Sequence, residues 1–312
     1  MAVYTNLTNE HKEDIRTLYN LGKDADFIEI PEGILNTNYL IKDRDKKYVF
    51  RLLEGRRNID EELKELEFLN FLNKNDISCP RVSVNNLGKN HIFIQEKMGC
   101  LFDFIHGKKV NKIDSEVLRK IGSTLGRLHN LSQGRSIERT RKIDLDFFYD
   151  KISKIDLKTV LKKDHDLIME RYKEIKEVDF SSLPKGIVHN DIFPDNVFMG
   201  EKLSLIDFND CMNAPFIIDL AIVINFWIKI KEFSKDKEKK FIKIFLEAYE
   251  GERKLLPEEK KLLKKMVLKM ALTFIFLRIN KSYVEDNRGK NMEVKTYKEL
   301  LFLLEEETDE IY

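Results

Sequence analysis

Residues 187–208 read IVHNDIFPDNVFMGEKLSLIDF. This stretch decides the fold, because it places polar side chains at the ends of two short apolar runs. The first run leads to His189 and Asp191, and Asn196 follows five residues after Asp191. The second run leads to Asp207. Such a pattern predicts a strand, a loop and a further strand, with a tight turn in between that sets Asp207 beside Asn196.

These residue types fit the chemistry of phosphoryl transfer from ATP. That reaction needs a carboxylate to accept the proton of the attacking hydroxyl, and oxygen ligands for Mg²⁺. Asp191 suits the first role, and Asn196 and Asp207 suit the second, since Mg²⁺ keeps several waters and needs few protein ligands. The interval from Asp191 to Asn196 is that of the kinase catalytic loop. The alternative is an acidic surface hairpin in which Asp191, Asp195 and Asn196 bond only to their own backbone.

The wording of this loop resembles the aminoglycoside phosphotransferase and choline kinase-like superfamily, whose members are relatives of the protein kinases. With the later run IDLAIVINFW at 218–227, it most resembles the bacterial homoserine kinases of that superfamily. The resemblance implies an α+β, bilobal, protein-kinase-like fold with an antiparallel-sheet N-lobe, carrying one main helix, over 1–98 and a mostly helical C-lobe over 99–312. It also implies ATP and Mg²⁺ as cofactors and transfer of the γ-phosphoryl group to L-homoserine, a step of threonine biosynthesis.

Near the N-terminus, a polar turn fits the phosphate side of a nucleotide site. Strand-like runs at 26–30 and 39–42 flank it, and it contains Gly33, Asn36 and Asn38. Backbone N–H groups and small polar side chains of such a turn can cover phosphates, although the same residues form ordinary hairpins. The segment resembles the Gly-x-x-Asn-x-Asn-Tyr run of homoserine kinases, which implies nucleotide binding by these three residues.

A cation and a glutamate follow. Arg51 lies on an alternating strand where the superfamily carries a lysine or arginine for the α and β phosphates, and a guanidinium suits phosphate oxygens. The run 60–73 has helical apolar spacing, and Glu65 matches the superfamily glutamate that pairs with that cation. A surface role for Arg51 is the alternative, and Arg56 and Arg57 are close enough to compete.

Further strands are expected at 79–82 and 91–96, paired through a polar turn. The alternation breaks after 96, which predicts the hinge between lobes. In this fold the hinge backbone reads the adenine edge, so the position alone implicates Glu96 and Met98 in nucleotide binding.

The rest of the chain is predicted to be mainly helical. His129 lies in a helix at 115–131 and is expected to be a packed structural residue, while Gly122 and Gly126 permit close helix packing. Asp219 is expected to brace the catalytic loop. Further helices are expected at 8–22, within a charged insertion at 134–180, from 218 to 230, and at 236–250, 257–280 and 294–307.

The acceptor pocket has to hold opposite charges if it takes homoserine, which carries an ammonium and a carboxylate. The candidate residues follow the metal site and lie on late helices: Asn209, Asp210, Asn213, Asn225, Trp227 and, for the carboxylate, Arg278. The chain differs from the residues typical of the family at 209–214 and at Thr273. Choline, ethanolamine or an aminoglycoside is the alternative acceptor, with a non-catalytic nucleotide-binding protein as the third interpretation.

The amino-acid composition limits the kinds of partner that we expect for this chain. Lys and Arg number 55 against 54 Asp and Glu, for a net charge of +1, so no bulk field attracts nucleic acid or a membrane. The three cysteines have no paired spacing for zinc or a disulfide framework. Without a signal-peptide layout or a run of membrane-spanning length, a cytoplasmic location is expected, with a small molecule as the partner.

Overall fold

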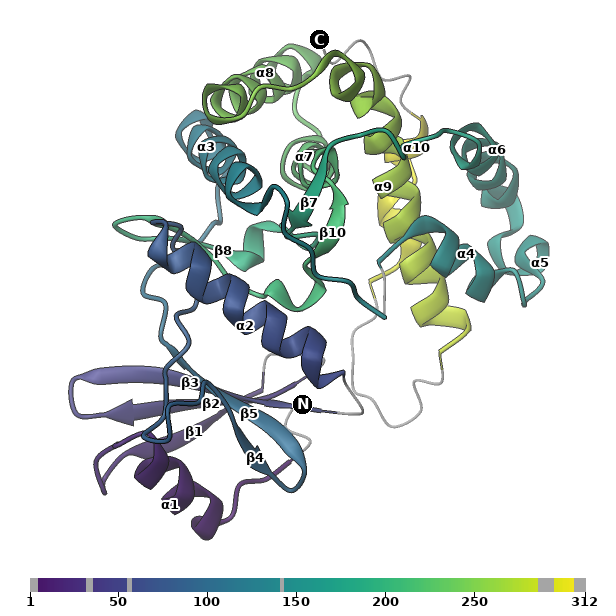
Figure 1. The fold of residues 1–312 in the computed structure, drawn as a ribbon. Coiled ribbons are helices and arrows are strands. Elements are labelled where there is room, and N and C mark those ends of the chain that lie inside the picture. The colour runs from purple at the N-terminus through teal and green to yellow at the C-terminus, as the bar shows by residue number, and fades with distance from the viewer. Residues whose placement is uncertain (1–4, 32–35, 55–57, 141–142, 286–294, 306–312) are drawn as a thin grey trace. The chain divides into compact units, whose positions relative to one another are not determined.

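The computed structural model describes residues 5–31, 36–54, 58–140, 143–285 and 295–305 (Figure 1). Contacts divide the chain into two compact units, Met1–Gly107 and Lys108–Tyr312. The division lies later than the boundary at 98/99 expected from the sequence, because the last long strand of the first unit runs through that position.

The first unit is a five-stranded antiparallel sheet with two helices. The strand order is β1-β2-β3-β5-β4, and neighbouring strands are antiparallel throughout. The elements are α1 (Asn9–Leu18), β1 (Asp26–Ile30), β2 (Asn36–Asp43), β3 (Lys46–Leu53), α2 (Ile59–Lys74), β4 (Ile92–Ile94) and β5 (Lys97–Asp103). This is the predicted antiparallel sheet with one main helix, to which the shorter α1 is added.

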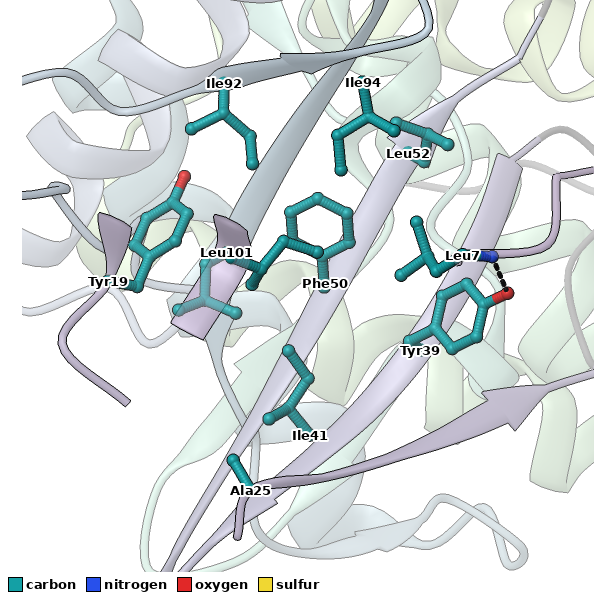
Figure 2. Packing of buried hydrophobic residues seen from close by; sticks show 11 residues of the cluster. Leu7, Tyr19, Ala25, Tyr39, Ile41, Phe50, Leu52, Ile92, Ile94 and Leu101 are labelled. Atoms are coloured by element: carbon teal, nitrogen blue, oxygen red, sulfur yellow. Dashed lines mark hydrogen bonds between the residues drawn. The ribbon is translucent and has the colours of Figure 1, made fainter. Parts of the chain in front are cut away.

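Alternation along β3 gives the sheet its two faces. Phe50 and Leu52 point into an apolar cluster with Tyr39 of β2 and Ile15 of α1, and Figure 2 shows how these sheet residues pack. The Tyr39 hydroxyl in this cluster accepts a hydrogen bond from the Leu7 amide, 3.1 Å away. The opposite face carries α2. The predicted alternation of this strand is therefore confirmed.

Two expected features of this unit are corrected. Residues 79–82 do not pair with 91–96; Val82 instead bridges Phe102 of β5, and Ser83 N–H donates to Leu101 O at 2.8 Å. The break after 96 is not a hinge but the tip of the β4–β5 hairpin. Its two turn residues have positive φ, 50° at Gln95 and 64° at Glu96, the conformation that two-residue hairpins favour.

The N-terminal helix is shorter than predicted. Thr8 caps α1 by accepting from the His11 N–H at 3.2 Å, as the sequence suggests. The helix ends at Leu18, before Gly22, because Asn20 adopts a left-handed φ of 54°.

The second unit is mostly helical around two small antiparallel sheets. β7 (Lys185–Val188) pairs with β10 (Met212–Pro215), and the three-stranded sheet has the order β6-β8-β9. Its strands are β6 (Lys108–Lys109), β8 (Val197–Met199) and β9 (Leu203–Leu205). The helices are α3 (Ser115–Ser132), α4 (Leu145–Ile152), α5 (Leu157–Leu161), α6 (His165–Lys176), α7 (Ile217–Val223), α8 (Lys235–Glu252), α9 (Pro257–Tyr283) and α10 (Phe302–Glu305).

Most predicted helices are present, with two exceptions. After α7 the chain continues as a π-helical segment, Ile224–Ile228, and a short 3₁₀ turn, Lys229–Lys231. The expected helix at 294–307 is a 3₁₀ turn, Tyr297–Leu300, followed by α10, and its ends lie outside the described residues.

Helices α3 and α8 pack without side chains between them at two points. A Cβ on Gly122 would lie 2.5 Å from Phe245 O, and one on Gly126 would lie 2.8 Å from Tyr249 O. Both are far shorter than real Cβ contacts, so only glycine fits. The prediction that these glycines permit close packing is confirmed.

Candidate active site

The catalytic loop starts at the end of β7, where a buried carboxylate holds its backbone. The Asp219 carboxylate accepts the His189 N–H through Oδ2 and the Asn190 N–H through Oδ1, each at 2.8 Å. Asn190 has a left-handed φ of 63°, and this turns the chain out of the strand. Asp219 thus braces the loop, as expected.

His189 locks the loop rather than taking part as a base. Its Nε2–H donates to Ile206 O at 3.0 Å, and its Nδ1 accepts the Asp191 N–H at 3.3 Å. Burial lowers the pKa of His189 despite the nearby Asp219 and Asp207 carboxylates, so the ring is neutral. With one nitrogen donating and the other accepting, this tautomer is fixed by its partners.

Asp191 and Asn196 come together as predicted. The Asn196 Nδ2 donates to Asp191 O and to Asp191 Oδ2, both at 2.8 Å. The amide nitrogen is used by these bonds, so the opposite end of the amide, Oδ1, faces away from Asp191. Since its carboxylate takes a side-chain bond, Asp191 is not simply closing a turn on its own backbone.

The pKa of Asp191 is raised from its usual value to about 8. Burial is the main cause, the carboxylates of Asp210 and Asp207 add to it, and the Asn196 bond only partly opposes it. A carboxyl with its pKa near neutrality is poised to exchange a proton with a hydroxyl.

Asp207 is delivered by the β8–β9 hairpin. Val197 pairs with Leu205, and the Ile206 N–H donates to Asn196 O at 2.9 Å, which sets Asp207 beside Asn196 as the turn predicted. Asp207 has a φ of 64° and an exposed side chain. Its Oδ1 accepts a hydrogen bond from Asn209 Nδ2.

This donor set suits a hard divalent cation. A carboxylate from Asp207 and an amide oxygen from Asn196 are the ligand types that Mg²⁺ accepts while it keeps its waters. Among the described residues, no group of three or more His, Cys, Asp or Glu is placed to hold a metal. A site of one carboxylate and one amide needs no such group.

A buried arginine that sequence reasoning missed supports the turn after Asp207. Arg139 is 6% exposed, and its Nε donates to Cys211 O at 2.9 Å while Nη2 reaches Phe208 O at 3.4 Å. It fixes the 3₁₀ turn that carries Asn209 and Asp210. Nothing in the local sequence signals this contact, since Arg139 lies about seventy residues earlier in a charged segment.

Of the expected acceptor residues, Asn209, Asp210 and Asn213 lie around this turn. Asn213 belongs to β10 and lines a cavity of about 220 Å³ that Lys269 and Thr273 of α9 also line. One cavity is therefore bordered by Asn213 and Thr273, two positions where the chain differs from the residues typical of the family.

The other expected acceptor residues are engaged elsewhere. Trp227 is fully buried, and its Nε1–H donates to Ile192 O at 2.7 Å. Asn225 is 1% exposed and donates to Val267 O at 2.7 Å. Both form part of the core because the π-helical segment is buried on every side. Arg278 pairs with Glu299 at 3.1 Å. The burial of Trp227 and Asn225 corrects the acceptor wall expected from the sequence, whereas the role of Arg278 in acceptor binding stays a prediction.

In the first unit, the expected ion pair is present. Arg51 Nη2 lies 2.9 Å from Glu65 Oε1, and both side chains are largely buried. Burial alone would lower the pKa of Arg51, but the carboxylates of Glu65 and Glu62 outweigh it and raise that pKa. Asn38 lies directly opposite Arg51 in the β2–β3 register, so the two share a face.

The remaining nucleotide-binding candidates have mixed positions. Asn36 is buried and starts β2, so it and Asn38 are strand residues rather than turn residues. Gly33 lies outside the described residues, as do Arg56 and Arg57. Glu96 is in the β4–β5 turn and Met98 is buried in β5, so the argument that placed them at a hinge no longer applies.

Residues 26–258 match the phosphotransferase enzyme family, and this match includes the catalytic loop and the Arg51–Glu65 pair. The chain belongs to that family. Homoserine kinases from Sinorhizobium medicae and Gluconobacter oxydans are 29% and 27% identical to this chain. Each alignment covers 89% of this chain, and 86% and 90% of the relatives respectively.

Solved structures of other kinases have a similar fold. An amicoumacin kinase in complex with AMP-PNP and Ca²⁺ matches with a TM-score of 0.72 at 17% identity, covering 96% of this chain and 92% of that one. A microcompartment-associated aminopropanol kinase matches with a TM-score of 0.66 at 16% identity, covering 96% and 94%. The kinase-like α+β fold expected from the sequence is confirmed. In the described part of the chain, no helix is both long and apolar enough to cross a membrane.

Proposed function

We propose that this family member is an ATP-dependent homoserine O-kinase that produces O-phosphohomoserine for threonine biosynthesis. The observation that carries the proposal is the catalytic loop. A carboxyl with its pKa raised to about 8, Asp191, lies against Asn196, and the following hairpin presents Asp207 beside it. Similarity to homoserine kinases along 89% of the chain supports homoserine as the acceptor.

Asp191 is the group that takes the proton. Its carboxylate orients the acceptor hydroxyl and receives the hydroxyl proton as the oxygen attacks the γ-phosphorus and ADP departs. The Asn196 amide holds one oxygen of that carboxylate in place, so the other is directed to the acceptor. His189 stays neutral and fixes the Asp191 backbone through the bond at 3.3 Å.

Asn196 Oδ1 and the Asp207 carboxylate would hold a divalent cation, Mg²⁺ in the cell. Such a cation neutralises charge on the phosphate oxygens. In the first unit, Arg51 and Asn38 share a strand-pair face that is suited to the nucleotide phosphates, and Glu65 keeps the guanidinium oriented. Asn36 and Gly33 belong to the same proposed nucleotide site, and Asn209, Asp210 and Asn213 to the acceptor side. Because all three cysteines are free and buried, we propose action in the cytoplasm.

An ADP-release assay with Mg-ATP tests the acceptor. L-Homoserine, choline, ethanolamine and an aminoglycoside are compared after the acceptor-free rate is subtracted. Homoserine alone should stimulate ADP release strongly, and ³¹P NMR should detect a phosphate monoester in the product. Stimulation by another alcohol but not by homoserine would contradict the acceptor and leave the reaction class intact. The same assay with Asp191→Asn protein is the control that assigns the rate to this site.

A further inference from the structure

The braced loop is connected to a buried polar chain that the phosphotransfer mechanism does not use. At its far end, between α8 and α9, Glu259 binds Arg253 with both carboxylate oxygens, at 2.9 and 3.2 Å. Arg253 Nη1 also donates to the Tyr249 hydroxyl at 3.1 Å. Glu259 and Tyr249 are fully buried and Arg253 is 5% exposed. A charged pair this deeply buried is costly unless each partner is satisfied.

The chain continues from Tyr249 to the carboxylate that braces the loop. Tyr249 Oη lies 2.8 Å from His129 Nδ1, and His129 Nε2 lies 3.0 Å from Asp219 Oδ2. All three side chains are fully buried. The His129 ring stacks on Phe216, with 4.8 Å between centroids, and the Arg253 guanidinium lies 4.4 Å from the centre of the same ring. Phe216 therefore packs against both His129 and Arg253.

The chemistry of the end groups fixes the direction of the bonds that Asp219 and Arg253 make in this chain. Asp219 Oδ2 can only accept, so His129 carries its proton on Nε2. Arg253 can only donate, so the Tyr249 oxygen accepts from it, and the same hydroxyl forms the bond to His129 Nδ1. Hydrogen bonding to His129 keeps the pKa of Asp219 below its usual value despite burial. Asp219 is therefore an anion, the form that accepts the two backbone N–H groups of the loop.

We propose that Tyr249, Arg253 and Glu259 are positioning residues for phosphoryl transfer. They act through His129 and Asp219 on the backbone of His189 and Asn190, and so on the placement of the Asp191 carboxylate. They touch neither nucleotide nor acceptor. Removing one bond from this chain leaves its neighbours free to rotate, and the geometry of the loop loosens without loss of the fold.

Tyr249→Phe tests the proposal, because it removes the central hydroxyl and keeps the ring. We expect amide hydrogen exchange of the peptide that contains His189 and Asn190 to increase by about tenfold, the equivalent of one lost hydrogen bond. We also expect kcat to fall by a similar factor of about ten while KM for ATP stays within twofold of the wild type. The exchange measurement needs no acceptor, so its result is independent of which alcohol is the substrate.

Tyr297→Phe is the matched control. Tyr297 is also buried, and its hydroxyl donates to Asp164 Oδ2 at 3.0 Å, away from the catalytic loop. This variant should lose comparable stability with no change in loop exchange or kcat. If Tyr249→Phe behaves like Tyr297→Phe in both readouts, the positioning role is refuted. If Tyr249→Phe does not fold, Glu259→Gln decides by the same two readouts at the far end of the chain, and unchanged values there refute the proposal.

Discussion

The catalytic loop and the expected acceptor wall differ in how far the sequence determines them. Asp191, Asn196 and Asp207 lie within one loop and hairpin, and the structure brings them together as their spacing requires. Asn225 and Trp227 lie on a helical segment, and the structure turns both into the core. A polar residue at the end of a strand lies in the loop that follows, so its position is set by the local sequence. The environment of a residue on a helix depends on how that helix packs, which the local sequence does not determine.

The largest expected effect is on kcat, from a substitution in the catalytic loop. Asp191→Asn keeps the size of the side chain but removes the proton acceptor, so kcat should fall by the roughly 10²- to 10⁴-fold of a lost general base. ATP binding, measured by isothermal titration, should stay close to that of the wild type. A variant that turns over at the wild-type rate would show that Asp191 is not the base.

The pH dependence gives the next largest effect. Because the pKa of Asp191 is raised to about 8, the carboxyl is protonated below that pH and cannot accept a proton. We expect kcat/KM for ATP to rise about tenfold per pH unit up to pH 8 and to level off above it.

A bound cation beside the carboxyl lowers its pKa, so the acid limb of kcat should lie at a lower pH than that of kcat/KM. Asp191→Asn should lose the limb altogether. A kcat/KM that is flat or falling between pH 6 and 8 would contradict the assignment of the raised pKa to the base.

The smallest expected effect is on acceptor binding, from a substitution in the helical segment. Trp227→Phe removes the donor to Ile192 O and leaves that carbonyl buried without its partner, which should lower the free energy of unfolding by about 1–3 kcal/mol. Urea denaturation measures this loss. KM for the acceptor should stay within twofold of the wild type, whereas a tryptophan lining the substrate pocket would raise it strongly when shortened.

Sequence reasoning succeeded where a feature depends on local order along the chain. The β8–β9 hairpin, the alternation of β3 and the Arg51–Glu65 pair follow from spacing, periodicity and resemblance. Sequence reasoning failed where two different backbone structures give the same sequence pattern. A break in alternation after 96 fits a hinge as well as a hairpin tip, and only the positive φ of Gln95 and Glu96 separates them.

Contacts between distant segments were the second kind of miss. Arg139 holds the turn after Asp207 from about seventy residues away, and Arg278 is paired with Glu299 of the C-terminal segment. The partner of Arg278 cannot be chosen from the sequence, since charged residues make up 35% of the chain and many pairings are equally plausible. Arg139 donates to backbone carbonyls, which every residue carries, so its partners leave no signal in the sequence either.

Gly122 and Gly126 have a consequence that extends beyond helix packing. Their bare backbone sets the spacing between α3, which carries His129, and α8, which carries Tyr249. A methyl group at Gly126 would lie 2.8 Å from the carbonyl of Tyr249 itself, so α8 would have to retreat and the hydroxyl would leave the ring nitrogen. The two glycines thus keep α3 and α8 close enough for this hydrogen bond. Two positions with no functional group therefore control the geometry of the proposed positioning chain.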